Sequence, residues 1–134
     1  MADLISTQAV HHLTLTVSDI ARSEKFYTTL FNFQKAGEFG PRTILSNGTV
    51  LLVLTPPPDP SQAIPEDRFN ENRIGLDHVS FSVASMADLE GAVKILDAQG
   101  IEHGAITPLE GVGIAILAIR DPDNIQIELT APVS

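Results

Sequence analysis

The feature that most constrains the fold is a pair of segments that repeat one pattern with different letters. Residues 10–17 read VHHLTLTV and residues 76–83 read LDHVSFSV. At this offset of 66 positions His12 aligns with His78, and each hydroxyl residue that follows aligns with another hydroxyl residue. Repetition of this kind indicates that the chain contains two copies of one folding unit.

A second repeat lies farther along each copy and is broken at one position. Residues 50–55 read VLLVLT, residues 125–130 read IQIELT, and the offset between them is 75 positions. Glu128 therefore aligns with Val53, so one copy carries a carboxylate where the other carries an apolar side chain. Two histidines and one carboxylate thus occupy repeat-related places.

Composition favours a small globular protein whose partner is a small molecule. The 134 residues suit one compact domain or two small halves, and 43% hydrophobic residues are enough to form a core. The net charge of −9 and the scattered distribution of eight Lys and Arg residues argue against nucleic acid or an anionic membrane as partner. No apolar stretch approaches the roughly 20 residues of a membrane span, and no secretory leader is recognisable, so we expect a cytoplasmic protein.

Residue patterns predict the same succession of elements in both copies. Residues 9–17 alternate in polarity as a half-buried strand does, with His12 and Thr14 on the polar face. His11 falls on the apolar face, where a packing role or a capped strand end is favoured over metal binding. In the first copy we expect a helix at 20–31 and strands at 34–38, 42–46 and 49–55; in the second we expect a strand at 76–83, a helix at 86–99 and strands at 102–107, 112–120 and 124–130.

These elements define an α+β protein of two βαβββ modules, module one at 9–55 and module two at 76–132. The segment 56–75 between them is rich in proline and charge, and proline donates no hydrogen bond within a central strand. We therefore interpret this segment as a linker. Arg68 and Arg73 within it are candidate substrate contacts, although a solvated linker explains them equally well.

Three candidate metal ligands lie on the polar faces of their strands. His78 and Ser80 share one face of a strand, and Gln126 and Glu128 share one face of the last strand. Two imidazoles and one carboxylate suit a divalent metal ion and leave coordination positions open for water or substrate. Taken singly, each residue is better explained as a structural one. Agreement of all three through the repeat favours a metal site at His12, His78 and Glu128.

The same residues resemble the vicinal oxygen chelate superfamily, which includes glyoxalases, bleomycin resistance proteins and extradiol dioxygenases. The resemblance covers nearly the whole chain and rests on HLTLTVSD at 12–19, GLDHVSF at 75–81 and DPDNIQIEL at 121–129. It implies a glyoxalase-like fold, an open eight-stranded mixed β-barrel built from both modules. It also implies that the two histidines and the glutamate stand at the metal positions of the family.

The resemblance further implies what the site holds and how chains assemble. Iron, manganese, nickel, cobalt and zinc all accept imidazole and carboxylate ligands, so a divalent metal is expected but not a particular one. Thr14, Ser80 and Gln126 would face a small-molecule substrate. Small two-module members usually pair as homodimers, which implies sites that take the first histidine from one subunit and the ligands of module two from its partner.

Departures from subfamily patterns narrow the expected activity. Glyoxalase I and the epimerases place a fourth ligand where this chain has Val53, which neither binds metal nor takes a proton. Fosfomycin thiol transferases use polar residues of the second module where this chain has Leu109 and Ala118. The outer tyrosine and histidine of extradiol dioxygenases would fall near Ala118 and Ile64, so this match is incomplete as well.

These comparisons leave two classes of function open. We expect a metal-dependent enzyme that acts on a small, largely apolar oxygenated substrate, with dioxygenase-like chemistry ahead of lyase, isomerase or thiol-transferase chemistry. The alternative is a binding or sequestration protein of the resistance type, with no turnover.

Overall fold

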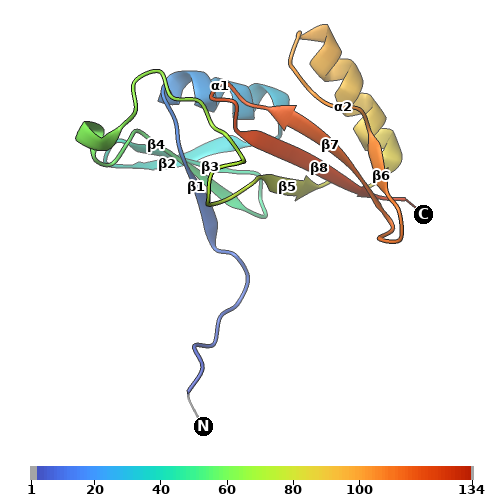
Figure 1. The fold of residues 1–134 in the computed structure, drawn as a ribbon, viewed down its shortest axis with the longest axis horizontal. Coiled ribbons are helices and arrows are strands. Elements are labelled where there is room, and N and C mark those ends of the chain that lie inside the picture. The colour runs from blue at the N-terminus through green and yellow to red at the C-terminus, as the bar shows by residue number, and fades with distance from the viewer. Residues whose placement is uncertain (1–2, 134) are drawn as a thin grey trace. The chain divides into compact units, whose positions relative to one another are not determined.

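The computed structural model of the protein describes residues 3–133. They form two compact units, the first ending at Ala63 and the second beginning at Ile64. Each unit contains one strand, one α-helix and three further strands in that order, which is the order expected for both modules (Figure 1). The described strands hydrogen-bond as two four-stranded mixed sheets and form no closed barrel. The expected α+β class with two βαβββ modules is confirmed.

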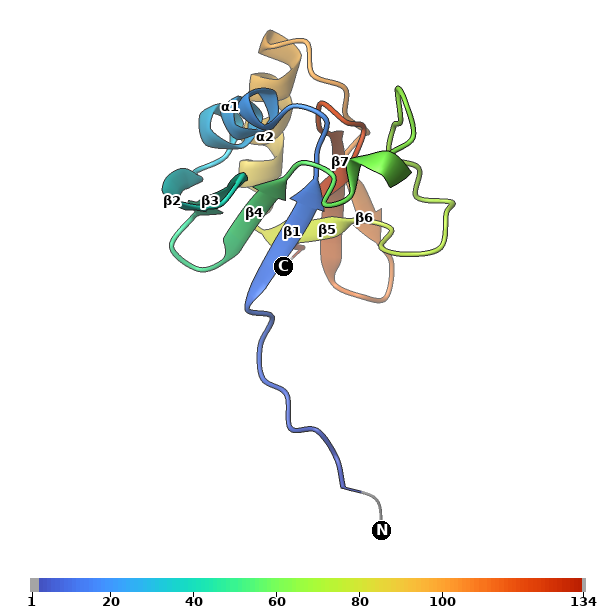
Figure 2. The same ribbon diagram turned by 90° about the vertical axis from the view of Figure 1, so that its left-hand side faces the viewer.

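The first unit packs helix α1 (Ile20–Leu30) on one face of its sheet (Figure 2). In spatial order the strands are β1 (His12–Thr16), β4 (Leu51–Thr55), β3 (Arg42–Ser46) and β2 (Gln34–Phe39), and a short 3-10 helix η1 (Pro60–Gln62) follows β4. Asp19 begins α1 by accepting a hydrogen bond from the Arg22 backbone N–H at 3.1 Å. Tyr27 of α1 and Leu52 of β4 are fully buried, so the core of this unit lies between helix and sheet.

The second unit repeats this plan with helix α2 (Met86–Ala98) against its sheet. In spatial order the strands are β5 (Val79–Ser82), β8 (Gln126–Pro132), β7 (Ile114–Arg120) and β6 (Thr107–Leu109). The Ser85 backbone N–H donates to the Asp88 carboxylate at 3.0 Å, which caps the start of α2 as its sequence predicts. Gly100 follows the helix with φ +66°, a conformation that favours glycine.

Several element ends differ by one to three residues from those expected, and two differences involve histidines. Strand β5 begins at Val79, so His78 immediately precedes the strand. The strand expected at 102–107 is wrong, because β6 begins only at Thr107 and His103 makes a single bridge to Ile119. The His103 ring bonds to Asp97 of α2, and regular pairing with β7 resumes four residues later.

Strand register shows that the two sequence repeats belong to one structural repeat. Thr14 of β1 pairs with Val53 of β4, and Ser80 of β5 pairs with Glu128 of β8. Both pairings are parallel, and both connect residues that the offsets of 66 and 75 positions make equivalent. Glu128 therefore occupies in module two the sheet position that Val53 occupies in module one.

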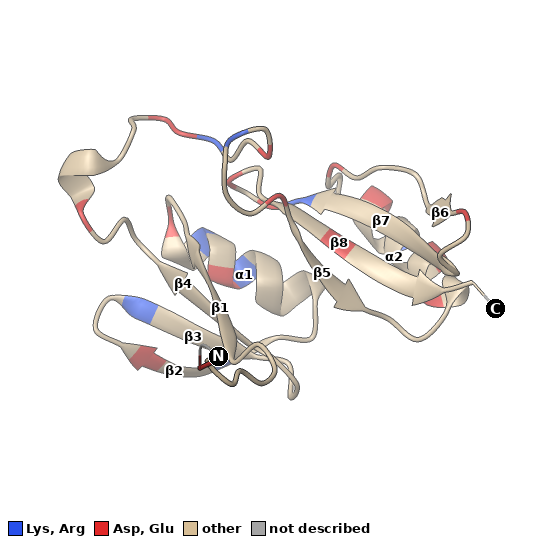
Figure 3. Cartoon of the chain, turned by 60° about the horizontal axis from the view of Figure 1, so that its bottom comes forward, with Lys and Arg blue, Asp and Glu red and all other residues tan. Residues whose placement is uncertain are grey.

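The segment that precedes β5 is fastened to the turn between β7 and β8. The Phe69 backbone N–H donates to the Asp123 carbonyl oxygen at 2.9 Å, and the Asn124 side-chain amide donates to the Phe69 carbonyl oxygen at 2.9 Å. Acidic and basic residues are interspersed along this segment (Figure 3). Residues 64–73, the second half of the segment expected to be a linker, are thus held to the second unit by hydrogen bonds.

Within residues 3–133, no helix combines the length and hydrophobicity that crossing a membrane requires.

Candidate metal centre

His78 and Glu128 come together on one face of the second sheet. His78 Nε2 lies 3.3 Å from Glu128 Oε1, and the exposed fractions of the two side chains are 37% and 8%. The parallel register that pairs Ser80 with Glu128 brings the histidine two residues earlier to the same face. The structure therefore brings together two of the three predicted ligands.

Each of these two side chains also contacts a neighbouring residue through the polar atom that does not face the other. The Gln126 side-chain amide donates to Glu128 Oε2 at 2.9 Å, which leaves Oε1 directed at His78. Asp77 Oδ1 lies 2.8 Å from His78 Nδ1, a separation at which the ring N–H donates to the carboxylate. Gln126 was predicted as a substrate contact, and in the structure its amide contacts the glutamate.

The facing atoms of the pair call for a positive species between them. With Nδ1 carrying a proton toward Asp77, Nε2 of a neutral ring presents a lone pair to the carboxylate oxygen 3.3 Å away. Two acceptors at this distance are stabilised by a proton or by a metal ion. Donor atoms with metal bonds of about 2.1 Å lie about 3 Å apart when they are adjacent ligands, so the spacing fits a divalent ion.

His12 lies at the equivalent place in the first unit. It begins β1 on the exposed face, and its Nδ1 lies 2.9 Å from His11 Nδ1. The His11 side chain is exposed and directly precedes the strand, so of the two roles expected for it the position fits a strand end and not packing. The strand begins only at His12, so the strand alternation does not extend to the preceding residue.

The proposed three-ligand set draws on both units. Neither unit by itself contains a group of three or more His, Asp or Glu side chains placed to hold a metal ion, as far as residues 3–133 are concerned. His78 and Glu128 belong to the second unit and His12 to the first. The set of three therefore stays a prediction, supported by one observed pair and one repeat-related histidine.

Comparison with known proteins shows the family of the chain. Residues 9–129 match the model of the Glyoxalase/Bleomycin resistance protein/Dioxygenase superfamily. The chain belongs to this superfamily. Over 130 residues it is 30% identical to Uncharacterized protein YwkD of Bacillus subtilis (strain 168), a match that covers 91% of this chain and 95% of that protein.

Solved structures show the same fold. A glyoxylase/bleomycin resistance protein/dioxygenase domain from Frankia sp. EAN1pec superposes with a TM-score of 0.74 at 30% identity, covering 95% of this chain and 93% of that chain. Lactoylglutathione lyase from Agrobacterium tumefaciens superposes with a TM-score of 0.73 at 22% identity, covering 93% and 94%. The latter likeness shows the fold alone.

The remaining predicted contacts of this superfamily member are placed as follows. Thr14 is exposed on β1, and the Ser80 hydroxyl bonds to the hydroxyl of Thr130. Arg73 pairs with Asp67 at 3.1 Å, and Arg68 is exposed. Both arginines line a hollow of about 530 Å³ within the segment 64–73 and beside Asn124.

An ion pair that fastens this segment was not foreseen. Arg120 Nη2 at the end of β7 lies 2.6 Å from Glu71 Oε2, and the two side chains are about one quarter exposed, 24% and 27%. The hydrogen bond from Arg120 lowers the pKa of Glu71, and the same bond raises the pKa of Arg120. Two opposite charges 49 positions apart give no sequence signal of contact.

On the sheet face that carries His78 and Glu128, the neighbouring strand β7 contributes apolar side chains. Ala118 of β7 lies in register beside Glu128, and Ile116 lies beside Thr130. Both β7 side chains are half-buried. A polar row from β5 and β8 thus adjoins an apolar row from β7, which suits a ligand with an oxygenated end and an apolar body.

Proposed function

We propose that this superfamily member is a divalent-metal-dependent enzyme that acts on a small oxygenated, partly apolar substrate. The observation that supports the proposal is the pair of His78 and Glu128, whose facing atoms lie 3.3 Å apart. His12 completes the ligand set in this proposal. A metal ion with these three protein ligands supplies charge stabilisation to oxygen atoms that bind at its open positions.

The chain's own residues define what the site offers a substrate. Glu128 contributes the negative charge that balances a divalent ion, and Gln126 keeps that carboxylate turned toward His78. Ala118 and Ile116 contact the apolar body of the substrate. Thr14 and Ser80 orient its oxygen atoms or water, and the exposed Arg68 and Arg73 of the 64–73 segment contact its polar end.

Within the superfamily, the broken repeat favours dioxygenase-like chemistry over isomerisation. Proton transfer next to a metal needs a base within hydrogen-bond reach of the substrate. Val53 stands in module one at the sheet position of Glu128, and Ala118 lies directly beside Glu128. Neither side chain takes a proton, so these positions suit a reaction in which substrate and dioxygen are brought together.

Assembly is part of the same proposal. The chain forms a homodimer in which each site takes His12 from one subunit and His78 with Glu128 from the other. The assignment of the three ligands to two different units supports this arrangement.

Oxygen uptake by protein loaded with Fe²⁺ tests the proposed chemistry. Catechols of increasing apolar bulk serve as substrates, and we expect uptake that a chelator abolishes and that the His78→Ala variant lacks. The Asp97→Ala variant, altered on α2 and outside the predicted ligand set, serves as the matched control and should retain uptake. Uptake by His78→Ala equal to that of the unaltered protein would contradict the assignment.

A binding protein without turnover is the second candidate. It is favoured by the small apolar Ala118 beside Glu128 and by the Ser80 hydroxyl, which is already bonded to Thr130. These contacts leave few groups for acid or base catalysis. Tight binding of an apolar oxygenated ligand that is indifferent to chelator would favour this candidate over the enzyme.

A further inference from the structure

The residue that precedes each site histidine contacts the same ring nitrogen of that histidine. In module two Asp77 Oδ1 lies 2.8 Å from His78 Nδ1. In module one His11 Nδ1 lies 2.9 Å from His12 Nδ1. His11 and Asp77 are equivalent at the offset of 66 positions, so the contact is repeated although the residue is not.

We propose that His11 and Asp77 are positioning residues that accept a hydrogen bond from Nδ1–H of the following histidine and thereby present its Nε2 as the metal ligand. The inference rests on the proposed ligand roles of His12 and His78. It assigns a role to two residues that lie outside the ligand set and outside the strands.

The chemistry of the partner decides the direction of the bond in module two. Both ring nitrogens face carboxylates, which only accept, and the contact of Nδ1 with Asp77 at 2.8 Å is shorter than that of Nε2 with Glu128 at 3.3 Å, so the single proton of a neutral ring is assigned to Nδ1. Nε2 of the neutral ring then carries the lone pair, and it is this nitrogen that lies 3.3 Å from Glu128 Oε1. A bond from one ring nitrogen to an outer partner selects the other nitrogen for the metal.

In module one an imidazole partner permits the same arrangement. Two ring nitrogens 2.9 Å apart form a hydrogen bond only if one carries the proton and the other accepts it. If His12 donates, His11 keeps its own proton on Nε2 and both rings stay neutral. Nε2 of His12, a residue that is exposed, then has a lone pair for a metal ion.

The two partners differ in charge, and the difference has a measurable effect. A carboxylate partner makes the histidine a stronger metal donor than a neutral imidazole partner does. We therefore expect removal of Asp77 to weaken metal binding more than removal of His11. Losing such an outer partner typically lowers metal affinity by about 10- to 100-fold.

The test is the tautomer of each ring in the full-length, metal-free protein. Long-range ¹H–¹⁵N correlation spectra, recorded at a pH at which the rings are neutral, distinguish a proton on Nδ1 from one on Nε2. We expect Nδ1–H for His12 and His78. A proton on Nε2 of either histidine overturns the proposal for that module.

Paired variants separate positioning from a general structural role. Asp77→Ala should move the His78 proton to Nε2, whereas Asp77→Asn, which keeps an acceptor oxygen, should leave it on Nδ1. His11→Ala should move the His12 proton, and His11→Asp, which copies module two, should retain it. The Asp97→Ala control should leave both rings unchanged. An unmoved proton in either alanine variant, with the fold intact by circular dichroism, sinks the role of that residue.

Zn²⁺ titration of the same variants distinguishes this proposal from the metal site itself. The expected tautomers, together with a lower Zn²⁺ affinity of Asp77→Ala, support both the positioning role and the metal site. Expected tautomers without Zn²⁺ binding by the unaltered protein would remove the proposed function and with it the positioning role, while the hydrogen bonds stand. Nε2–H tautomers in a protein that binds Zn²⁺ would remove the positioning role alone.

Discussion

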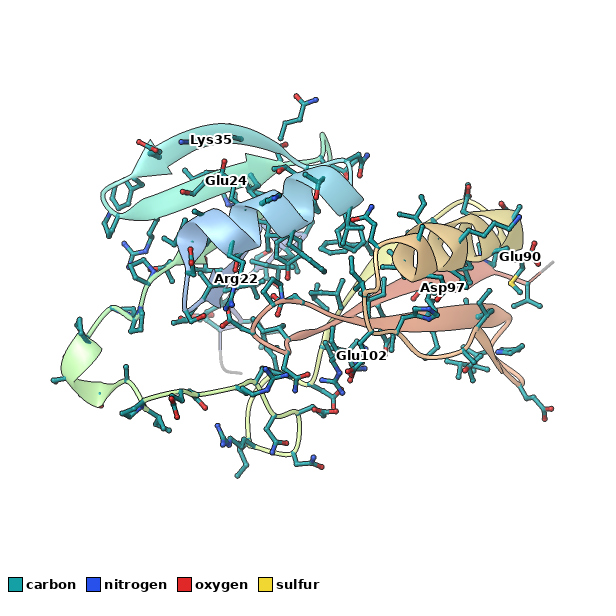
Figure 4. All side chains as sticks on the ribbon, turned by 90° about the horizontal axis from the view of Figure 1, so that it is seen from above. Arg22, Glu24, Lys35, Glu90, Asp97 and Glu102 are labelled. Atoms are coloured by element: carbon teal, nitrogen blue, oxygen red, sulfur yellow. The ribbon has the colours of Figure 1, made fainter. Side chains whose placement is uncertain are left out.

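At the residue scale, His103 shows how a histidine outside the site is held. Its Nε2 lies 2.6 Å from Oδ1 of Asp97, a residue of α2 that Figure 4 labels, and its Nδ1 lies 2.6 Å from the Gly104 carbonyl oxygen. Both contacts favour the protonated ring, and the hydrogen bond to Asp97 is the larger cause that raises the pKa of His103 above 6.5. The ring thus ties α2 to the chain that leads into the second half of the sheet.

The sign of this shift predicts a pH-dependent stability. A histidine whose pKa is raised by folding stabilises the folded state fully below its unfolded pKa, and the effect is lost as pH rises through the folded pKa. Asp97→Ala should therefore lower the free energy of unfolding at pH 5.5, by under about 1 kcal/mol because the Asp97 carboxylate is 64% exposed, and change it less at pH 9. Urea unfolding at both pH values measures this, and an equal loss at both would contradict it.

The sequence predicts which side chains share a sheet face where strand register determines their positions. The repeat predicts that His78 and Glu128 share a face, because residues two apart on a strand project to the same side. It does not predict that Gln126 binds Glu128 or that His11 bonds His12. Those contacts depend on side-chain rotamers and on where the strand starts, and a single sequence records neither.

At the scale of elements, the Arg120 and Glu71 ion pair holds the 64–73 segment against the end of β7. Arg120 also donates through Nη1 to the Asn124 carbonyl oxygen at 3.1 Å, which connects the segment to the β7–β8 turn. Arg120 lies in register with Gln126, on the face that carries Glu128. The segment is therefore anchored at the end of the candidate site.

Removing this anchor should loosen the segment without unfolding the sheet. In Arg120→Met the Phe69 amide, which donates to the Asp123 carbonyl oxygen, should exchange its hydrogen faster by on the order of tenfold, since charge-assisted bonds are lost. Hydrogen exchange followed by NMR measures the change. Arg73→Met, which removes only the exposed pair with Asp67, is the control and should have less effect. An unchanged Phe69 rate in Arg120→Met would show that the ion pair does not anchor the segment.

Element order was predictable and element ends were less so. Alternation, helix caps and glycine turns mark each strand and helix, and the order they predict is the order observed. The misplaced strand at 102–107 lies at a sheet edge, where one neighbour specifies pairing and the His103 side chain competes by bonding to α2. The linker interpretation missed contacts of 64–73 that join residues about 50 positions apart.

At the scale of the whole molecule, the broken symmetry between modules is the feature with functional weight. Both modules repeat the same register, yet one carries Glu128 and the other Val53 at the same place. The proposed three-ligand site therefore takes one histidine from module one and a histidine with a glutamate from module two. In the proposed dimer, module one of one chain and module two of the other supply the ligands of each site, so metal binding requires dimerisation.

Mixing two inactive variants tests shared sites. His12→Ala and His78→Ala chains, unfolded and refolded together in equal amounts, should form mixed dimers with one intact and one doubly altered site. Half of the dimers are mixed, so metal capacity should return to roughly a quarter of the unaltered value. Each variant refolded alone should bind far less metal than the mixture. No recovery in the mixture would show that each site forms within one chain.

The most direct test of the central claim is metal stoichiometry. Protein purified without chelator, dialysed against Mn²⁺ or Zn²⁺ and measured by elemental analysis should hold about one divalent ion per chain. His12→Ala, His78→Ala and Glu128→Ala should each hold far less, while Asp97→Ala should match the unaltered protein. Undiminished metal in His78→Ala would contradict a site built from the two histidines and the glutamate.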